Sequence, residues 1–317
     1  MAWARAQHAV TPANLPDGTA YQPAIFLDAR TSVGTAATRD GKSLRLLLVG
    51  ADQPVRQLRR VAFDENPSFQ TFAVAGEVLL WAQGARGKIQ IWRAGLRDRR
   101  TPQELTADAG DAAFYHSQYD LIVNGSRLYW VAARADDATE VRSIALTGGP
   151  VDTRTVPGKW TLSAWPWLVD GITATGGTTL LRNLDTNQDM HVAGLGSRSV
   201  TQCSPAWCQV ATLSRDGSSR IDLMHPDGSA RQHVAGGTAE TVIADAAPLD
   251  RYEVYSATGP DSDLTGNVRL LVFEIATRRT VEVSPDAGRV SYRNGVLSWA
   301  TGSQDTFIWH ALDLRTI

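Results

Sequence analysis

The sequence predicts an all-β fold, and two observations carry this prediction. Apolar and β-branched runs are short and end repeatedly in Gly, Asn-Gly or Asp-Gly, and no window has the 3.6-residue period of a long helix. One segment type also recurs, in which an apolar strand, a turn that contains glycine and a second apolar strand follow one another. Residues 72–81, 121–130 and 290–299 show it most clearly, and each segment ends in tryptophan. Asn-Gly and Asp-Gly suit such hairpins because both residues tolerate the positive φ of primed turns.

The hairpins recur at a spacing that is typical of β-propeller blades. Successive turns are separated by 35, 49, 46, 35, 44 and 45 residues when they are placed at Gly41, Gly76, Gly125, Gly171, about Ala206, Asp250 and Gly295. Blades of four strands repeat at roughly 40 to 50 residues. Third and fourth strands follow most of the hairpins. We therefore expect a single closed β-propeller of about seven four-stranded blades, and the two short steps leave six or eight blades as alternatives.

We expect the chain to divide into an N-terminal extension, residues 1–20, and a single propeller domain, residues 21–317. The last unit ends just after its third strand, which would leave an unpaired sheet edge. An N-terminal strand, residues 21–29, can cover this edge by pairing with residues 306–314. We expect that pairing to close the ring.

Composition excludes two classes of partner. The net charge is −2, and the 31 basic residues are scattered along the chain, so we expect no nucleic-acid partner. No apolar run approaches the roughly 18 to 20 residues of a membrane span, so we expect no membrane insertion. The first residues lack the pattern of a signal peptide, and we expect any leader to be absent from this chain. We further expect a monomer without a cofactor.

The two cysteines, Cys203 and Cys208, are separated by four residues. They are too few for a zinc site, and no Cys-x-x-Cys redox motif is present. We expect a disulfide across a tight hairpin, which implies an oxidising compartment. The alternative is a reduced pair that packs as small apolar groups.

Two short segments resemble TolB-like propeller repeats, which are WD-repeat-like in organisation. They are Ile-Asp-Leu-Met-His-Pro-Asp-Gly at 221–228, followed by Arg-Gln-His-Val at 231–234, and Thr-Arg-Asp-Gly-Lys-Ser-Leu at 38–44. The whole chain resembles actinobacterial exported TolB-like proteins of unknown function. The turns at Gly76, Gly125 and Gly295 lack the full Pro-Asp-Gly-Lys form. The resemblance implies a recognition scaffold with an extracytoplasmic location, secreted or in the cell envelope, and it does not identify a partner.

No linear catalytic motif occurs, so candidate site residues come from their positions in the repeat. Ser68, Ser117 and Ser163 each lie eight residues before a turn glycine, where innermost strands begin at the mouth of the predicted channel. Their hydroxyls could bind a polar ligand or ordered water. The alternative is that small residues are needed where strands converge.

Five further residues complete the candidate site. His116 is a candidate acid, base or ligand, because histidine as a residue type suits these roles, and the ring of nearby Tyr119 could wall a pocket. Trp165 and Trp167 break the repeat register of the other tryptophans and could stack on sugars or peptide side chains. Asp245 is an acidic group near a predicted loop entrance. Histidines and tryptophans are more often structural, so these assignments compete with packing roles.

The sequence favours an exported, non-enzymatic propeller that binds a protein, peptide or glycan through loops around its channel. The first alternative is a hydrolase or lyase that uses His116 with a carboxylate such as Asp245. A second alternative is a structural head of a larger assembly. We assign no metal ligands.

Overall fold

The computed structural model describes residues 3–51, 53–98, 100–171, 175–215, 217–302 and 307–317. Its helices are short: α1 (Ser262–Thr265) and the 3-10 helices η1 (Phe63–Glu65), η2 (Pro248–Asp250) and η3 (Leu314–Thr316). Within the described residues, no helix has the length and apolar character that crossing a membrane requires. The strands gather in two compact units, unit 1 (Met1–Ala4 and Pro157–Ser291) and unit 2 (Arg5–Val156 and Tyr292–Ile317).

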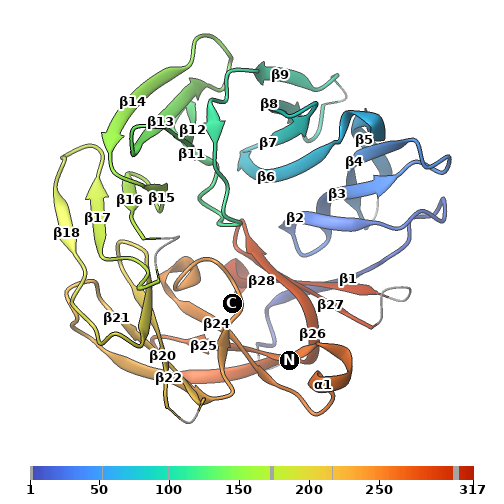
Figure 1. Cartoon of the computed structure of the whole chain (residues 1–317). Helices are drawn as coiled ribbons and strands as arrows, with labels where there is room; N and C mark the ends of the chain where they lie inside the picture. Colours follow the sequence, from blue (N-terminus) through green and yellow to red (C-terminus); the bar gives the residue numbers. More distant parts are fainter. Residues whose placement is uncertain (1–2, 52, 99, 172–174, 216, 303–306) are drawn as a thin grey trace. The chain divides into compact units, whose positions relative to one another are not determined.

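Unit 2 contains four antiparallel groups of strands. The first two are four-stranded sheets, blue and teal in Figure 1: β2 (Gln22–Asp28), β3 (Thr31–Ala37), β4 (Ser43–Gly50) and β5 (Gln53–Ala62), then β6 (Ser68–Ala75), β7 (Val78–Ala85), β8 (Lys88–Gly95) and β9 (Gln103–Thr106). In the third group β10 (Asp111–Ala112) and β11 (Ile122–Asn124) both pair with β12 (Arg127–Ala133), which is followed by β13 (Ala138–Ala145) and β14 (Asp152–Pro157). In the fourth, β28 (Ile308–Asp313) pairs with β27 (Val296–Thr301) and with β1 (Gln7–Pro12).

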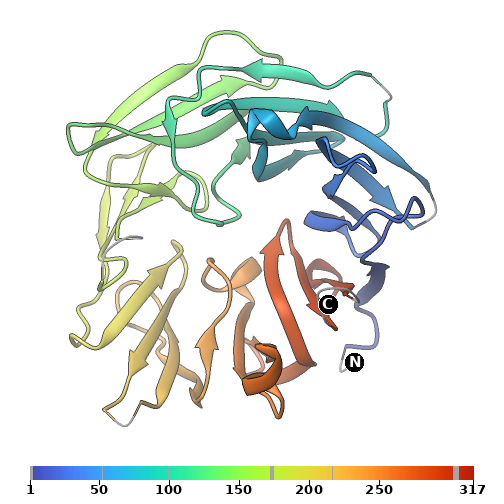
Figure 2. The same cartoon turned by 45° about the vertical axis from the view of Figure 1, so that its right-hand side comes forward.

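Unit 1 repeats the same antiparallel plan. Its first sheet runs β15 (Thr161–Leu162), β16 (Trp167–Val169), β17 (Leu180–Asn183) and β18 (Asp189–His191). Its second sheet, yellow in Figure 2, runs β19 (Ser199–Cys203), β20 (Cys208–Leu213), β21 (Ser219–Met224) and β22 (Gln232–Gly237). The third runs β23 (Glu240–Thr241), β24 (Tyr252–Thr258), β25 (Val268–Glu274) and the first part of β26 (Arg279–Arg293), which continues into unit 2 at Tyr292.

Strand β7, the second strand of its sheet, is buried on both faces, which explains its apolar run from Val78 to Ala82. In β7, Leu79 and Trp81 pack with Leu46 of the preceding sheet, whereas Leu80 packs with Trp130 of the following sheet. Trp81 and Trp130 are both 0% exposed. Successive side chains of a strand point to opposite faces, so a single strand contributes to two cores.

Two predicted turn positions belong to other parts of their sheets. Gly41 lies in the β3–β4 turn, and the hairpin of the innermost strands turns between Asp28 and Thr31. Gly171 follows β16, while the β15–β16 hairpin turns at residues 163–166. A glycine turn marks any hairpin of an antiparallel sheet, not only the innermost one. With the corrected positions, both of the short 35-residue steps disappear.

The N-terminal strand that pairs with β28 is β1, with Gln7 opposite Asp313 and Pro12 opposite Ile308. The prediction that residues 21–29 make this pair was wrong, because residues 22–28 form β2 and pair with β3; Thr306 lies outside the described residues. Burial explains the difference. Ile25 and Phe26 enter two separate cores, as an innermost strand requires, whereas Val10 of β1 is 58% exposed, as suits an outer edge.

Candidate functional site

The innermost strand of the third sheet is interrupted by a loop, residues 113–121, between β10 and β11. Hydrogen bonds within the loop fix its conformation. The Ser117 hydroxyl accepts a hydrogen bond from the Tyr119 N–H at 3.0 Å, and the Ser117 carbonyl accepts from the Asp120 N–H at 3.2 Å. The Asp120 carboxylate accepts from the Tyr115 N–H at 2.9 Å. Ser117 and Asp120 are buried, so the loop has a defined shape.

Arg293 connects this loop to the neighbouring sheet. Its Nη1 donates to the Ser117 carbonyl at 2.9 Å and to the Thr71 hydroxyl, in β6, at 3.1 Å. Its Nη2 lies 3.8 Å from the Asp120 carboxylate. The Arg293 side chain is 8% exposed, and a buried guanidinium with several acceptors holds its surroundings in one geometry.

A cavity of about 190 Å³ opens beside Arg293. Part of its wall is apolar, from Ile25, Phe72, Val74 and Val123, and part is polar or aromatic, from Gln118, Tyr119, Arg293 and Asn294. Asn294 and Gly295 form the β26–β27 turn with φ of 52° and 77°, the positive pair that a primed hairpin turn requires. The Asn294 amide donates to the Leu27 carbonyl at 3.2 Å, which holds the turn in place at the cavity.

The four candidates in unit 2 take different positions. Tyr119 lines the cavity, and Ser117 supports the loop from a buried position. His116 is exposed and has a φ of 64°. Ser68 begins β6, where its hydroxyl accepts from the Gln70 amide at 3.1 Å, and it is not among the residues that line this cavity. The structure thus brings Tyr119 and Ser117 together around Arg293.

The tryptophan candidates of unit 1 belong to one hairpin. The buried Ser163 donates its N–H to the Trp167 carbonyl at 2.9 Å, so it lies in the turn and not at the start of an innermost strand. Trp165 and Trp167 are partly exposed, and Trp167 packs against a core that includes Leu181 and Cys208. The three serines therefore do not occupy equivalent positions. Ser163 was expected at a strand start because it lies eight residues before Gly171, but Gly171 follows β16 and is not the turn between β15 and β16.

Asp245 is buried and lies just before a turn that a second acidic residue supports. The carboxyl group of Glu253 accepts hydrogen bonds from the Ala247 N–H, at 3.0 Å, and from the Gln209 amide. Complete burial raises the pKa of Glu253 to about 8, although both hydrogen bonds act in the opposite direction. His116 and Asp245 belong to different units, and their pairing stays a prediction.

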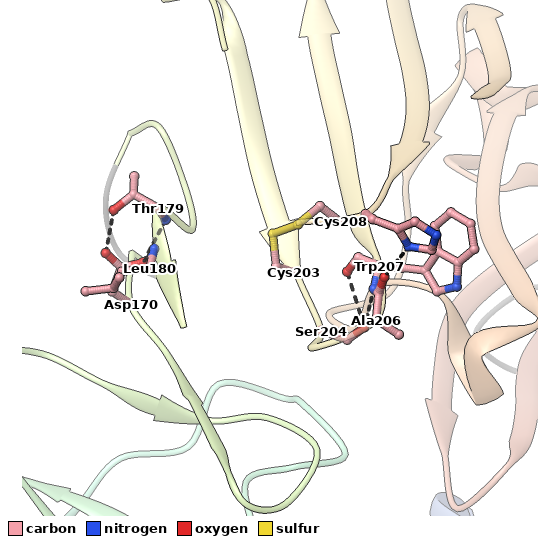
Figure 3. The surroundings of a disulfide bond; sticks show 9 residues. Asp170, Thr179, Leu180, Cys203, Ser204, Ala206, Trp207 and Cys208 are labelled. Atoms are coloured by element: carbon pink, nitrogen blue, oxygen red, sulfur yellow. Dashed lines mark hydrogen bonds between the residues drawn. A yellow bond between two sulfur atoms is a disulfide. The ribbon is translucent and has the colours of Figure 1, made fainter. Parts of the chain in front are cut away.

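The predicted disulfide joins Cys203 to Cys208, which face one another across the β19–β20 hairpin (Figure 3). The turn between them is closed by the Ser204 N–H, which donates to the Trp207 carbonyl at 2.7 Å. The Trp207 ring lies against the His225 ring, with centroids 4.3 Å apart. The hairpin is thus held covalently, by hydrogen bonds and by ring packing.

Reasoning from sequence missed Arg293, Gln118 and Asn294. A signal for Arg293 was present, because it is a charged residue in an otherwise strand-like run directly before an Asn-Gly turn. A charged side chain that is buried in a strand must be paired with hydrogen-bond acceptors, because an unpaired buried charge is destabilising. The acceptors are Thr71 and Ser117, which lie far away in the chain, so no local sequence pattern identifies them.

No family model matches the chain, and no curated protein matches it. Several solved structures are similar. An uncharacterized protein from Listeria monocytogenes is 8% identical with a TM-score of 0.55, over 91% of this chain and 94% of that one. A puromycin-hydrolyzing peptidase from Mycobacterium tuberculosis is 14% identical with a TM-score of 0.50, over 92% of this chain and 49% of the peptidase.

TolB from Acinetobacter baumannii is 10% identical with a TM-score of 0.44, over 84% of this chain and 66% of TolB. The consecutive four-stranded antiparallel sheets of both units are propeller blades. The chain has a β-propeller fold. At these identities the likeness concerns the fold alone, because one propeller fold carries many functions.

Proposed function

We propose that the chain is an exported binding protein, a closed propeller of about seven blades that recognises a peptide segment of a partner at the cavity beside Tyr119. The observation that carries this proposal is the cavity itself, with its apolar wall, its polar groups and the loop that Arg293 holds in place. A rigid loop loses little conformational entropy when a ligand binds.

The volume of the cavity favours a peptide over a glycan or a cofactor. Sites for drug-sized ligands span roughly 300 to 1,000 Å³, and this cavity has about 190 Å³. It suits one apolar side chain of a partner, while the Gln118 and Asn294 amides and the Tyr119 hydroxyl suit the polar backbone on either side. Tyrosine is also enriched among the residues that dominate binding energy.

Export is supported by the disulfide between Cys203 and Cys208, because disulfides persist in oxidising compartments. The alternative of a hydrolase has less support. His116 is the candidate acid or base; it is exposed, and Asp245, the carboxylate expected to work with it, belongs to the other unit. We therefore propose binding and not catalysis.

The test is selection from a random-peptide library on the purified chain, followed by affinity measurements on the enriched peptides. We expect Tyr119→Ala to weaken binding by roughly tenfold or more, as for a central aromatic contact. Phe63→Ala is the matched control, since Phe63 is 43% exposed and does not line the cavity. Equal binding by the Tyr119→Ala variant would show that the site is wrong, and a library without enriched peptides would contradict peptide recognition.

A further inference from the structure

A second polar feature belongs to unit 1, whereas the residues that line the cavity beside Tyr119 belong to unit 2. Two arginine side chains and one histidine side chain surround one buried carboxylate, and we call this group the Asp222 cluster: Arg220, Asp222, Arg231 and His233. The Asp222 side chain is 1% exposed, whereas those of Arg220, Arg231 and His233 are 55%, 43% and 54% exposed. A buried acceptor thus holds three exposed donors.

The sheet register explains how the cluster forms. Asp222 lies in the middle of β21, with Val210 of β20 opposite on one side and His233 of β22 on the other. Arg220 is two residues earlier on the same strand, and side chains two residues apart share a face. Arg231 comes just before β22 begins.

Each of the three side chains contacts the carboxylate directly. Nε of Arg220 lies 2.8 Å and 3.0 Å from the two Asp222 oxygens. Arg231 contacts one of these oxygens through Nη2 at 2.8 Å and Nε at 3.1 Å, and Nδ1 of His233 lies 3.2 Å from the other. Burial acts to raise the pKa of Asp222, but the hydrogen bonds from Arg231, Arg220 and His233 outweigh it, and the pKa lies below its usual value.

The positive charge exceeds what one carboxylate can neutralise. Both arginines are always protonated, so the cluster carries a net charge of +1 with neutral His233 and +2 with protonated His233. Donors also remain. Both Nη groups of Arg220 and Nη1 of Arg231 have no acceptor among the described residues, and Nε2 of His233 adds a further donor when the ring is protonated.

The geometry distinguishes this cluster from ordinary surface arginines. A free arginine side chain loses much rotamer freedom when it is immobilised. Here the carboxylate already holds both guanidinium groups, so less entropy is lost when a ligand binds. Forked N–H donors from two arginines are the arrangement that proteins use for tetrahedral oxyanions.

We propose that the Asp222 cluster is a binding site for a phosphate group, supplied as the free ion or as a phosphate monoester. The dianion would accept hydrogen bonds from the Arg220 and Arg231 donors that Asp222 does not occupy, and from Nε2 of His233 when the ring is protonated. Asp222 would not touch the ligand and would act as a positioning residue. This site is independent of the proposed peptide site, and either one can fail without the other.

The experiment is calorimetric titration of the full chain with inorganic phosphate and, separately, with phenyl phosphate, each against sodium chloride at equal ionic strength. We expect both phosphates to bind and chloride not to bind. Binding of inorganic phosphate alone would assign the site to the free ion, and binding of phenyl phosphate alone would assign it to monoesters. Absence of binding by both would overturn the proposal.

Variants locate the site. Arg220→Gln and Arg231→Gln are each expected to weaken phosphate binding by roughly fivefold or more, because each removes a charged forked donor. Both side chains are half-exposed, and the fold of each variant is checked by its thermal midpoint. Arg269→Gln is the matched control, since Arg269 is 42% exposed and pairs with a single carboxylate, that of Glu282. Unchanged binding by Arg220→Gln and Arg231→Gln would also overturn the proposal.

Discussion

Replacing Glu253 with glutamine is expected to remove a pH-dependent loss of stability from unit 1. The Glu253 carboxyl group is completely buried, and its pKa rises from 4.5 to about 8 in the folded chain. Between these two values the folded state keeps a proton that the unfolded state has lost. The folded state therefore binds more protons, and its stability falls as the pH rises from about 4.5 to about 8.

The two pKa values give the size of the effect. At about 1.4 kcal/mol per pH unit, the interval from 4.5 to about 8 corresponds to a total of roughly 5 kcal/mol. Between about pH 5 and about pH 8, Glu253 should lower the free energy of unfolding by roughly 3 to 4 kcal/mol.

Glutamine retains the shape of the protonated acid. Its carbonyl oxygen can accept from the Ala247 N–H, and its amide can donate to Gln209 once the Gln209 amide has turned by half a rotation. We therefore expect the Glu253→Gln variant to match the parent chain near pH 5 and to exceed its stability near pH 8. All other titrating groups are common to both chains and cancel in the comparison.

The assay is urea unfolding followed by tryptophan fluorescence at a series of pH values. Glu240→Gln is the matched control, because Glu240 is exposed and lies in β23 of the same unit. We expect the control to keep the pH dependence of the parent chain. Parallel curves of stability against pH for the parent and the Glu253→Gln variant would refute the reasoning.

Two further predictions concern other parts of the fold. His8 of β1 and His310 of β28 have ring centroids 5.6 Å apart, and burial lowers the pKa of each. The unfolded state therefore binds more protons, so the free energy of unfolding should fall as the pH drops below about 6.5. His8→Gln should reduce this loss in acid-denaturation curves. An equal loss in the variant would contradict the role of His8. Replacing Cys203 and Cys208 with serine should lower the free energy of unfolding by about 2 kcal/mol, through the entropy of a short closed loop. Reduction of the parent chain should have the same effect in urea unfolding, and no effect of either change would contradict this account.

Local chemistry made much of the fold predictable. The apolar run in β7, the Asn294-Gly295 turn and the Cys203–Cys208 hairpin are all short-range patterns, and the structure contains each of them. Strand periodicity and turn chemistry act over a few residues, so they can be read from one segment at a time. Tyr119 could be proposed as a cavity residue for a similar reason, as an aromatic next to a predicted innermost strand.

Other features were decided by contacts between distant residues. Gly41 and Gly171 look like innermost turns in the sequence, and only the strand pairing assigns them elsewhere. Residues 21–29 and Gln7–Pro12 both lie near the start of the chain, and only burial determines which of them pairs with β28.

The candidate site depends most on tertiary structure. Arg293 meets Thr71 across 222 residues and Ser117 across 176. The sequence by itself determined the repeating strands and turns, because these follow from local backbone preferences. Only the tertiary structure decided where the cavity forms, because a buried charge such as that of Arg293 selects its partners by proximity in space and not by spacing along the chain.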